Sequence, residues 1–408
     1  MNTSDSIRDT VKAASLIVEF MEDANWLGGS VYIENLLSTL SLLPETSQPK
    51  VELLFLSSPN SPTARRLLSY PIVQNNGDGL DLLNEMVVIM RGFYRRIGMR
   101  FPCLRYLSFS ARKGVYFPVF DISQPRRRNL YWIPDFQHHY LPELFSASDL
   151  ERRNHRYERI AQAEGILLLS SQSALKDFRR FYPNVSVEPR VWSFCSSVKV
   201  DDSESYHSVL EKYSLPAKFL YVANQFWMHK DHNTLFESLR LLHEKGIDVP
   251  VVCTGKEEDP RNPEYFSSLC EKLARHSVKQ VFFLGIIPRS EQIQLYRFAA
   301  AVVQPSQFEG WSTVIEDAKA LGRPIIASSI DVHKEQLQWV ENVHLFRASD
   351  PVHLSECIEV LWPDLTSGPD MGAEKLAAKR NDIRRIESAK AFMVIVEEAM
   401  TYPQCRKT

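Results

Sequence analysis

The 408-residue sequence is poor in cysteine, and none of its cysteines stands in a recognisable metal-binding arrangement. Its six cysteines are scattered, with no Cys-x-x-Cys pair and no cluster of histidine and cysteine at zinc spacing. This pattern argues against a zinc site and a disulfide framework, and it predicts free thiols in a reducing cytoplasm. No apolar run approaches the roughly 18 residues of a membrane span. The apolar stretch at 13–20 is short and runs into acidic residues, so we expect no signal peptide there.

A strong net charge is also missing. The formal net charge is −2, so the molecule as a whole has no electrostatic signature of nucleic-acid binding. Apolar residues make up 44% and charged residues 24% of the chain, which is ordinary for a soluble globular protein. Because so long a chain exceeds one ordinary core, we expect two domains of roughly 150–200 residues each.

Short apolar runs alternate with longer amphipathic ones along most of the chain. The predicted strands are 15–20, 50–58, 114–120, 129–136, 165–171 and 185–194 in the first half, and 219–226, 249–255, 281–287, 300–306, 323–329 and 342–346 in the second. Continuous apolar strands that alternate with helices predict parallel sheets covered on both faces. The expected fold is therefore α/β, with two doubly wound, Rossmann-like domains that face a central cleft.

A polar stretch that begins with acidic residues, 199–214, is typical of a linker between domains. We expect a first domain at 1–198, a linker at 199–216 and a second domain at 217–372. The chain ends in an amphipathic helix, and we expect residues 373–408 to pack back on the first domain. Doubly wound sheets bind ligands beyond the carboxyl ends of their strands, so functional residues should follow strands. Four tryptophans do so or lie close by, namely Trp26, Trp132, Trp227 and Trp311.

Two clusters follow strands of the first half. Gly28 and Gly29 precede or open a helix, where close backbone approach and free N–H groups suit a phosphate, although a glycine pair also occurs in plain turns. The stretch 132–146, WIPDFQHHYLPELFS, is consistent with a solvated loop or with a polar cluster that meets sugar hydroxyls. Its two adjacent histidines point in different directions on any backbone, and we select His138.

A third cluster follows the first strand of the second half and contains Asn224, Gln225, His229 and Lys230. Lys230 is the best candidate for a phosphate-binding cation, because it lies just before a helix N-terminus that Asp231 or Asn233 would cap. The sequence HKDH supplies two histidines and one aspartate but no third strong protein ligand nearby, so we expect no metal.

The fourth cluster is FEGWSTVIEDAKALGRPIIAS, at 308–328. Glu309 follows a strand, and a helix begins at 312 or 313, where free N–H groups suit a diphosphate. A carboxylate can accept hydrogen bonds from both hydroxyls of a vicinal diol such as a ribose. Glu316 and Asp317 are also explained as ordinary acids of a first helical turn. That explanation does not extend to Glu309, which precedes the helix.

Residues 305–328, PSQFEGWSTVIEDAKALGRPIIAS, resemble the nucleotide-sugar motif of retaining family 4 glycosyltransferases, enzymes of the GT-B fold. The family pattern is Glu-Gly, a small residue, a second Glu eight positions after the first, and a G-x-P strand. Eight positions after Glu309 stands Asp317, so the second acid is Asp here, with Glu316 as the alternative. Asn224 stands where the family commonly has Arg. The phosphate-binding cation would then be Lys230 alone, or Lys230 together with Arg289 or with another arginine.

The resemblance implies hexosyl transfer, with retention, from a nucleoside diphosphate sugar to a hydroxyl of a glycan or lipid-linked acceptor, as in polysaccharide biosynthesis. It implies that no metal or other cofactor is needed, that the first domain faces the acceptor and that the second binds the donor. Glu309 and His138 would contact the sugar, and Asp317 or Glu316 the ribose. The donor phosphates would lie among Gly28, Gly29, Asn224, Gln225, His229, Lys230, Ser312, Thr313 and Val314. A GT-B nucleotide-sugar epimerase, or a non-catalytic nucleotide-binding partner, stays open as an alternative.

A basic segment in the first half bears on the acceptor. No acidic residue occurs between Met86 and Phe120, while seven basic residues do. A helix through 86–100 would carry an apolar stripe with its arginines mainly off that stripe. An ordinary domain helix with solvated arginines and a membrane-surface element at 86–113 are equally consistent with this pattern. The second alternative would make the protein peripheral at the inner face of the membrane.

Overall fold

The computed structural model of the chain describes residues 14–20, 27–55, 61–74, 114–122, 128–200 and 206–403, to which all structural statements refer. The basic segment 86–113, for which a domain helix and a membrane-surface element were equally consistent, lies outside the described residues. Among the helices within them, none combines the length and the apolar character needed to cross a membrane.

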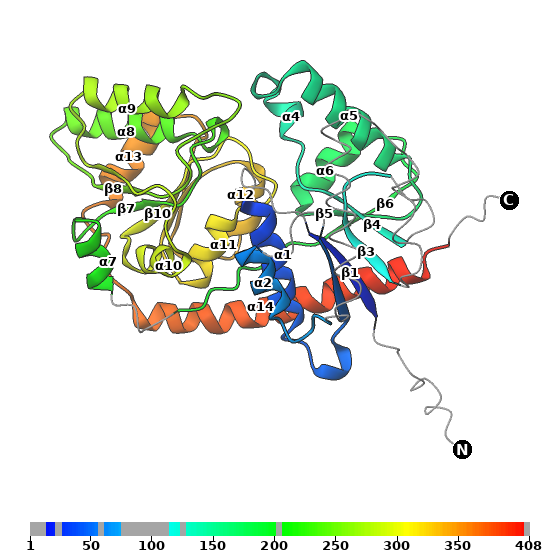
Figure 1. Cartoon of the computed structure of the whole chain (residues 1–408). Coiled ribbons are helices and arrows are strands. Elements are labelled where there is room, and N and C mark those ends of the chain that lie inside the picture. Colours follow the sequence, from blue (N-terminus) through cyan, green and yellow to red (C-terminus); the bar gives the residue numbers. More distant parts are fainter. Residues whose placement is uncertain are drawn as a thin grey trace.

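Two parallel six-stranded sheets form two lobes (Figure 1). The first has the order β2-β1-β3-β4-β5-β6 and the second the order β12-β11-β10-β7-β8-β9. The strands of the first are β1 (Ser15–Phe20), β2 (Lys50–Phe55), β3 (Val115–Val119), β4 (Arg128–Ile133), β5 (Ile166–Leu169) and β6 (Glu188–Val191). Those of the second are β7 (Leu220–Val222), β8 (Val251–Cys253), β9 (Val281–Phe283), β10 (Ala301–Gln304), β11 (Ile325–Ser328) and β12 (Val343–Phe346). The predicted fold class is confirmed.

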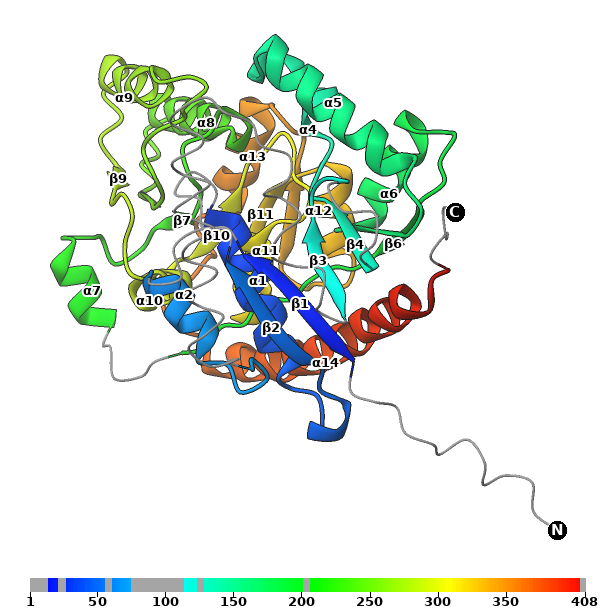
Figure 2. The same cartoon turned by 45° about the vertical axis from the view of Figure 1, so that its right-hand side comes forward.

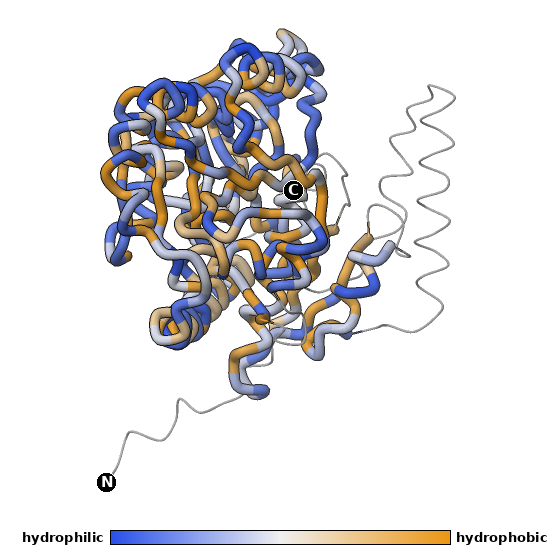
Figure 3. Tube along the Cα trace, turned by 90° about the vertical axis from the view of Figure 1, so that its left-hand side faces the viewer, coloured by the Kyte–Doolittle hydropathy of each residue, from blue (hydrophilic) through white to orange (hydrophobic). Residues whose placement is uncertain are grey.

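Central strands such as β5 are apolar along their whole length because each sheet has a core on both of its faces. In β5, Ile166 and Leu168 belong to one hydrophobic cluster, whereas Leu167 and Leu169 belong to another. Side chains of a strand alternate between the two faces of a sheet, so only a continuous apolar run can serve both cores. The helices that cover the sheets instead alternate between hydrophobic and hydrophilic residues along their length (Figure 3).

Helices connect the strands in both lobes. The first lobe contains α1 (Leu27–Leu40), α2 (Pro62–Leu68), α4 (Gln137–Tyr140), α5 (Ala147–Ala161) and α6 (Gln172–Phe181). The second contains α7 (Tyr206–Lys212), α8 (His232–Glu244), α9 (Tyr265–Arg275), α10 (Arg289–Phe298), α11 (Thr313–Ala320), α12 (Asp331–Leu337) and α13 (Pro351–Leu361). Helix α7 lies within the predicted linker, and its Val209 is buried in a core of the second lobe. The first sheet ends at Val191 and the second begins at Leu220. Any boundary between these two residues is consistent with the strands, and the limits given for the domains remain predictions.

The last helix, α14 (Met371–Thr401), runs along both lobes (Figures 1 and 2). At its start, Glu374 forms an ion pair with Arg297 of α10, with Nε and Oε1 2.6 Å apart. Towards its end, Trp192 Nε1 donates to the carbonyl oxygen of Ser388 at 3.0 Å. Residues beyond that point enter the core of the first lobe; they are Ala389, Phe392, Ile395, Val396 and Ala399.

Candidate functional site

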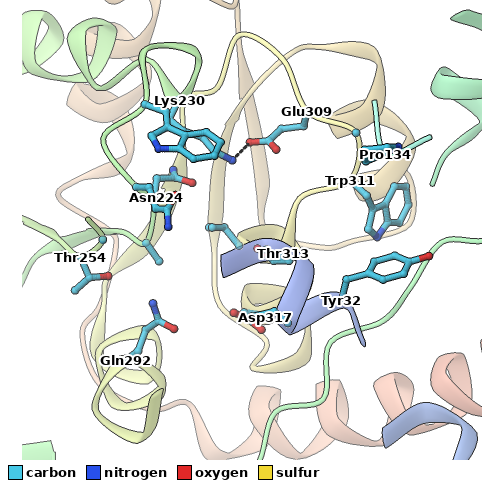
Figure 4. Close-up of a pocket in the computed structure, with 18 of the residues that line it drawn as sticks. Tyr32, Pro134, Asn224, Lys230, Thr254, Gln292, Glu309, Trp311, Thr313 and Asp317 are labelled. Carbon is cyan, nitrogen blue, oxygen red and sulfur yellow. Dashed lines mark hydrogen bonds and ion pairs between the residues drawn. The ribbon is translucent and has the colours of Figure 1, made fainter. Parts of the chain in front are cut away.

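A pocket of about 380 Å³ lies between the lobes, at the carboxyl ends of strands from both sheets (Figure 4). In the second sheet the strand order reverses between β7 and β10, which pair directly, and the loops after both strands line the pocket. A reversal of this kind is where doubly wound sheets hold their ligands. Three of the four tryptophans expected at a cleft, Trp132, Trp227 and Trp311, line the pocket, while Trp26 is outside the described residues.

Glu309 and Lys230 form an ion pair on one wall of the pocket (Figure 4). Lys230 Nζ donates to Glu309 Oε1 at 2.5 Å, across 79 residues of sequence. The same oxygen accepts from Ser306 Oγ at 2.7 Å and from Gln304 Nε2 at 2.9 Å. The Glu309 and Lys230 side chains are 9% and 18% exposed, so water screens the pair only weakly. The fold therefore brings together the two residues that the sequence singled out as carboxylate and phosphate-binding cation.

The position of Lys230 follows from a tight turn before α8. Residues Met228–Lys230 form a 3-10 turn, and Asp231 then adopts a left-handed conformation with φ of 53°. Asp231 Oδ1 accepts from the amide of Thr234 at 3.2 Å and thereby caps the helix. Of the two predicted caps, Asp231 is confirmed. This cap fixes the end of the turn that carries Lys230.

The two adjacent acids of α11 point to different surroundings. Asp317 lines the pocket, where Arg289 Nη2 donates to its Oδ1 at 2.6 Å. Glu316 is completely buried and does not line the pocket. Its carboxylate instead accepts from Lys319 Nζ at 2.6 Å, from Gln336 Nε2 at 3.1 Å, and faces Arg384 at 3.3 Å. Only Asp317 is placed to contact a ligand in the pocket.

The N-terminus of α11 opens into the pocket through Thr313 and Val314, which line it. Ser312 Oγ caps the helix by accepting from the amide of Ile315 at 3.4 Å. The amide of Ser312 donates to Gln336 Oε1 at 3.0 Å, and the residue is buried away from the pocket lining. Of the predicted group 312–314, the two later residues therefore line the pocket, while Ser312 braces the turn.

The segment after β7 supplies another stretch of pocket wall. Asn224, Gln225 and His229 all line the pocket, together with Lys230. Burial lowers the pKa of His229 well below its ordinary value, and the nearby charges of Lys230 and Arg261 lower it further. His229 is therefore neutral. Within the described ranges, no three His, Cys, Asp or Glu side chains are grouped as metal ligands.

The first lobe contributes fewer of the predicted residues. Gly28, in the first turn of α1, lines the pocket, whereas Gly29 is buried and lies outside the lining. Next to them Tyr32 stacks on Trp132, with ring centroids 4.3 Å apart. The predicted glycine pair is thus split between the pocket surface and the interior of the lobe.

His138 does not line the pocket, although the sequence had placed it there. Residues 137–140 form the short helix α4, which turns this imidazole into the first lobe, 5.2 Å from the ring of Tyr157. His138 Nε2 pairs with Asn154 Oδ1 at 3.1 Å. Burial lowers the pKa of His138 to about 4, and His139 adds to that shift. The polar side chain of this cluster that does reach the pocket is Asp135.

Two contacts between the lobes could not be predicted from sequence patterns. A Cβ on Gly310 would lie 2.2 Å from the carbonyl oxygen of Pro134, so only glycine allows this approach of the two lobes. Glu335 of α12 accepts from the amides of Gln172 at 2.8 Å and Ser173 at 2.9 Å, which caps α6 of the opposite lobe. These residues belong to different lobes, and no local periodicity connects them.

Comparison with known proteins agrees with this architecture. The family described as "Glycosyl transferases group 1" matches residues 202–364, which include every strand of the second sheet. The D-inositol 3-phosphate glycosyltransferase of Corynebacterium efficiens is 25% identical over 131 residues, 32% of this chain and 30% of that protein. An uncharacterized glycosyltransferase of Methanocaldococcus jannaschii is 31% identical over 103 residues, 22% of this chain and 26% of that protein. The matched region thus spans less than a third of either curated relative.

Solved structures resemble most of the chain. The Anabaena protein HepE, in complex with UDP and glucose, superimposes with a TM-score of 0.61 at 16% identity, covering 93% of this chain and 99% of that one. WaaG, a glycosyltransferase involved in lipopolysaccharide biosynthesis, gives a TM-score of 0.56 at 13% identity, covering 96% and 100%. At such identities the likeness concerns the fold alone, and that fold is GT-B.

Proposed function

We propose that this chain is a retaining glycosyltransferase that moves a hexose from a nucleoside diphosphate sugar to a hydroxyl of a glycan or lipid-linked acceptor. The observation that carries the proposal is the Lys230–Glu309 pair beside the open N-terminus of α11, in a pocket between two lobes. A glycosyltransferase group 1 domain and structural neighbours that bind UDP and UDP-glucose support it.

The groups in the pocket match the parts of such a donor. The Asp317 carboxylate would accept hydrogen bonds from the ribose hydroxyls, as carboxylates do in other nucleotide sites. Lys230, Arg289 and the amides of Thr313 and Val314 would face the diphosphate, where positive charge and a helix N-terminus favour an anion. Glu309 would accept hydrogen bonds from hydroxyls of the transferred sugar. These cations and amides neutralise the leaving diphosphate with groups of the chain itself, so the proposed reaction uses no metal or other cofactor.

In this reaction the bond between the anomeric carbon and the phosphate oxygen breaks, and a bond from the acceptor oxygen forms on the same face of the sugar. The acceptor's proton passes to an oxygen of the leaving phosphate. No side chain becomes the nucleophile. The protein positions the two substrates and stabilises the charges that develop between them. Lys230 and Arg289 stabilise the negative charge that grows on the diphosphate, and Glu309 stabilises the positive charge that develops on the sugar ring.

The acceptor and the location of the protein belong to the same proposal. Free cysteines, two of them buried, suit a cytoplasmic enzyme. We place it at the inner face of the membrane, in polysaccharide biosynthesis, with the basic segment 86–113 towards a lipid-linked acceptor. Anionic liposomes should then bind the protein in a salt-dependent way, and Arg91/Arg95/Arg96→Glu should abolish that binding. Binding that ignores both salt and these substitutions would exclude a membrane role for the segment.

A panel of UDP, GDP, dTDP and CMP sugars tests the activity through release of the nucleotide. Glu309→Gln and Lys230→Ala should each lower turnover by at least tenfold. The surface pair Lys245–Glu359, also 2.5 Å apart, offers matched controls in Lys245→Ala and Glu359→Gln, which should turn over normally. Normal turnover by both pocket variants would show that the site is misassigned. Nucleotide-sugar binding without turnover would favour a non-catalytic nucleotide-binding protein, and a new sugar on the intact nucleotide would favour an epimerase.

A further inference from the structure

Gln304 places a polar side chain at the buried end of an otherwise apolar strand. It is the last residue of β10, and it is completely buried. The three residues before it, Ala301, Val302 and Val303, pack into the two cores of the second lobe. A buried amide is costly unless its hydrogen bonds are satisfied, so the contacts of Gln304 indicate what it does there.

The Gln304 side chain connects two residues of the pocket. Asn224 Nδ2 donates to Gln304 Oε1 at 2.7 Å. At the other end, Gln304 Nε2 donates to Glu309 Oε1 at 2.9 Å and to Ser306 Oγ at 3.0 Å. A carboxylate only accepts hydrogen bonds, so the amino end of Gln304 must face Glu309 and its carbonyl end must face Asn224. The contacts with Glu309 and Asn224 together fix the orientation of the Gln304 amide.

This arrangement makes the two oxygens of Glu309 unequal. Oε1 accepts from Lys230, Gln304 and Ser306, at 2.5, 2.9 and 2.7 Å. Three donors occupy the lone pairs of this oxygen and hold the carboxylate in one orientation. Oε2 accepts no hydrogen bond from the part of the chain that the structure describes, and Glu309 lines the pocket. Oε2 is the oxygen with capacity left for a ligand.

We infer that Gln304 is a positioning residue that anchors Glu309 through Oε1 and so presents Oε2 to the hydroxyls of the transferred sugar. The inference rests on the proposed function, in which Glu309 binds the sugar. It also assigns a role to Asn224, which stands where the resembled family commonly has Arg. The Asn224 amide serves Gln304, and the positive charge for the diphosphate comes from Lys230 and Arg289. Gln304 and Asn224 thus act on the sugar end of the donor.

The test measures binding, because a positioning role predicts a loss confined to the sugar. Isothermal titration calorimetry of the full chain gives Kd for UDP, UDP-glucose, UDP-galactose, UDP-N-acetylglucosamine, GDP and GDP-mannose. The quantity to compare is the ratio of the Kd of each bare nucleotide to the Kd of its tightest-binding sugar derivative. In the wild type the sugar derivative should bind more tightly. Gln304→Met keeps the size of the side chain but loses the donor, and it should lower the ratio about tenfold, since hydrogen bonds to charged groups are strong. Kd for the bare nucleotide should stay within about twofold.

Gln292→Met is the matched control, because this glutamine also lines the pocket but contacts Arg289, with Nη1 and Oε1 2.5 Å apart. It should change both Kd values by the same factor and leave the ratio intact, as a general disturbance of the pocket would. Gln304→Glu, with a carboxylate against Glu309, should lower the ratio at least as far as Gln304→Met. If Gln304→Met fails to fold, Asn224→Ala frees the same amide without altering it and should lower the ratio about threefold.

The outcomes separate the inference from the function on which it rests. If the wild type binds none of the six compounds and none of the dTDP sugars of the activity panel, the proposed function fails and the inference fails with it. If the wild type favours a sugar derivative and both Gln304→Met and Asn224→Ala keep its ratio, the inference alone is overturned. The inference is also overturned if Gln304→Met weakens the bare nucleotide and its sugar derivative equally, because Gln304 would then act on the whole pocket.

Discussion

Glu316 and Asp317 are neighbours in the sequence, and the structure predicts that they can be separated by experiment. Glu316→Gln and Asp317→Asn each remove one negative charge and preserve the size of the side chain. Glu316 is enclosed by Lys319, Gln336 and Arg384, whereas Asp317 faces the pocket beside Arg289. We expect the first substitution to lower stability and the second to weaken nucleotide binding.

The size of each effect follows from exposure. The Glu316 and Lys319 side chains are 0% and 8% exposed, so Glu316→Gln leaves a buried cation without its carboxylate. Removing one partner of a buried pair costs about 3–5 kcal/mol. For a lobe of this size, that corresponds to a fall in Tm of roughly 6–20 °C. The Arg289 side chain is 43% exposed and keeps access to water when Asp317 is neutralised, whereas Asp317 itself is 6% exposed and also accepts a hydrogen bond from Ser196 Oγ. We therefore expect Asp317→Asn to lower stability less than Glu316→Gln does.

Nucleotide binding should show the opposite order. Hydrogen bonds to a charged acceptor contribute about 1.5–3 kcal/mol, so Asp317→Asn should weaken UDP or GDP binding roughly 10- to 100-fold. Glu316→Gln should leave Kd within about twofold below its Tm. Thermal unfolding by circular dichroism and isothermal titration of the same preparations supply both readings. Weaker nucleotide binding by Glu316→Gln at unchanged Tm, together with normal binding by Asp317→Asn, would refute the reasoning.

Two further perturbations test features outside the pocket. Glu335→Gln weakens the cap that Glu335 places on α6 of the opposite lobe. We expect this variant to have a larger radius of gyration than the wild type by small-angle X-ray scattering, and the control Glu359→Gln to have the wild-type radius. Equal radii for all three proteins would contradict a role of Glu335 in holding the lobes together. His232 stacks on Phe226, with ring centroids 4.1 Å apart, and burial lowers the pKa of His232 to about 3. The fold therefore accommodates the neutral imidazole, whose stabilisation is fully present above pH 6.5 and is lost as the pH falls towards 3. The loss amounts to about 2 kcal/mol between pH 7 and pH 5; His232→Phe should therefore show a smaller fall in Tm over that range than the wild type, and an equal fall would show that His232 is not the titrating group.

Much of the fold could be predicted because its signal is local. A strand such as β5 must be apolar on both sides to lie between two cores, and a run such as Ile166–Leu169 states this directly. The location of Lys230 and Glu309 at the pocket could be predicted because both follow strands of one sheet and carboxyl ends of parallel strands meet at one edge. Their ion pair was not predicted. The count of eight from Glu309 likewise selected Asp317, the acid that faces the pocket.

The remaining site residues depend on contacts that no local pattern encodes. His138 stands in a polar cluster after a strand, yet the helical turn at 137–140 directs it away from the pocket. Gln304 looks like the polar end of a strand, and its link between Asn224 and Glu309 emerges only when β7 and β10 pair. Glu335 caps a helix 162 residues away from it, as measured to Ser173. Such residues become visible only after the two lobes are placed against each other.

The path of α14 has a consequence for how the protein is made. The first lobe is the first to be synthesised, yet its hydrophobic core includes Phe392, Ile395 and Val396. Those side chains are translated after every strand of the second sheet, the last of which ends at Phe346. Domains of other proteins often fold in order as they leave the ribosome. Here the first lobe must wait, with part of its core uncovered, until the second lobe and the helix beyond it have been synthesised.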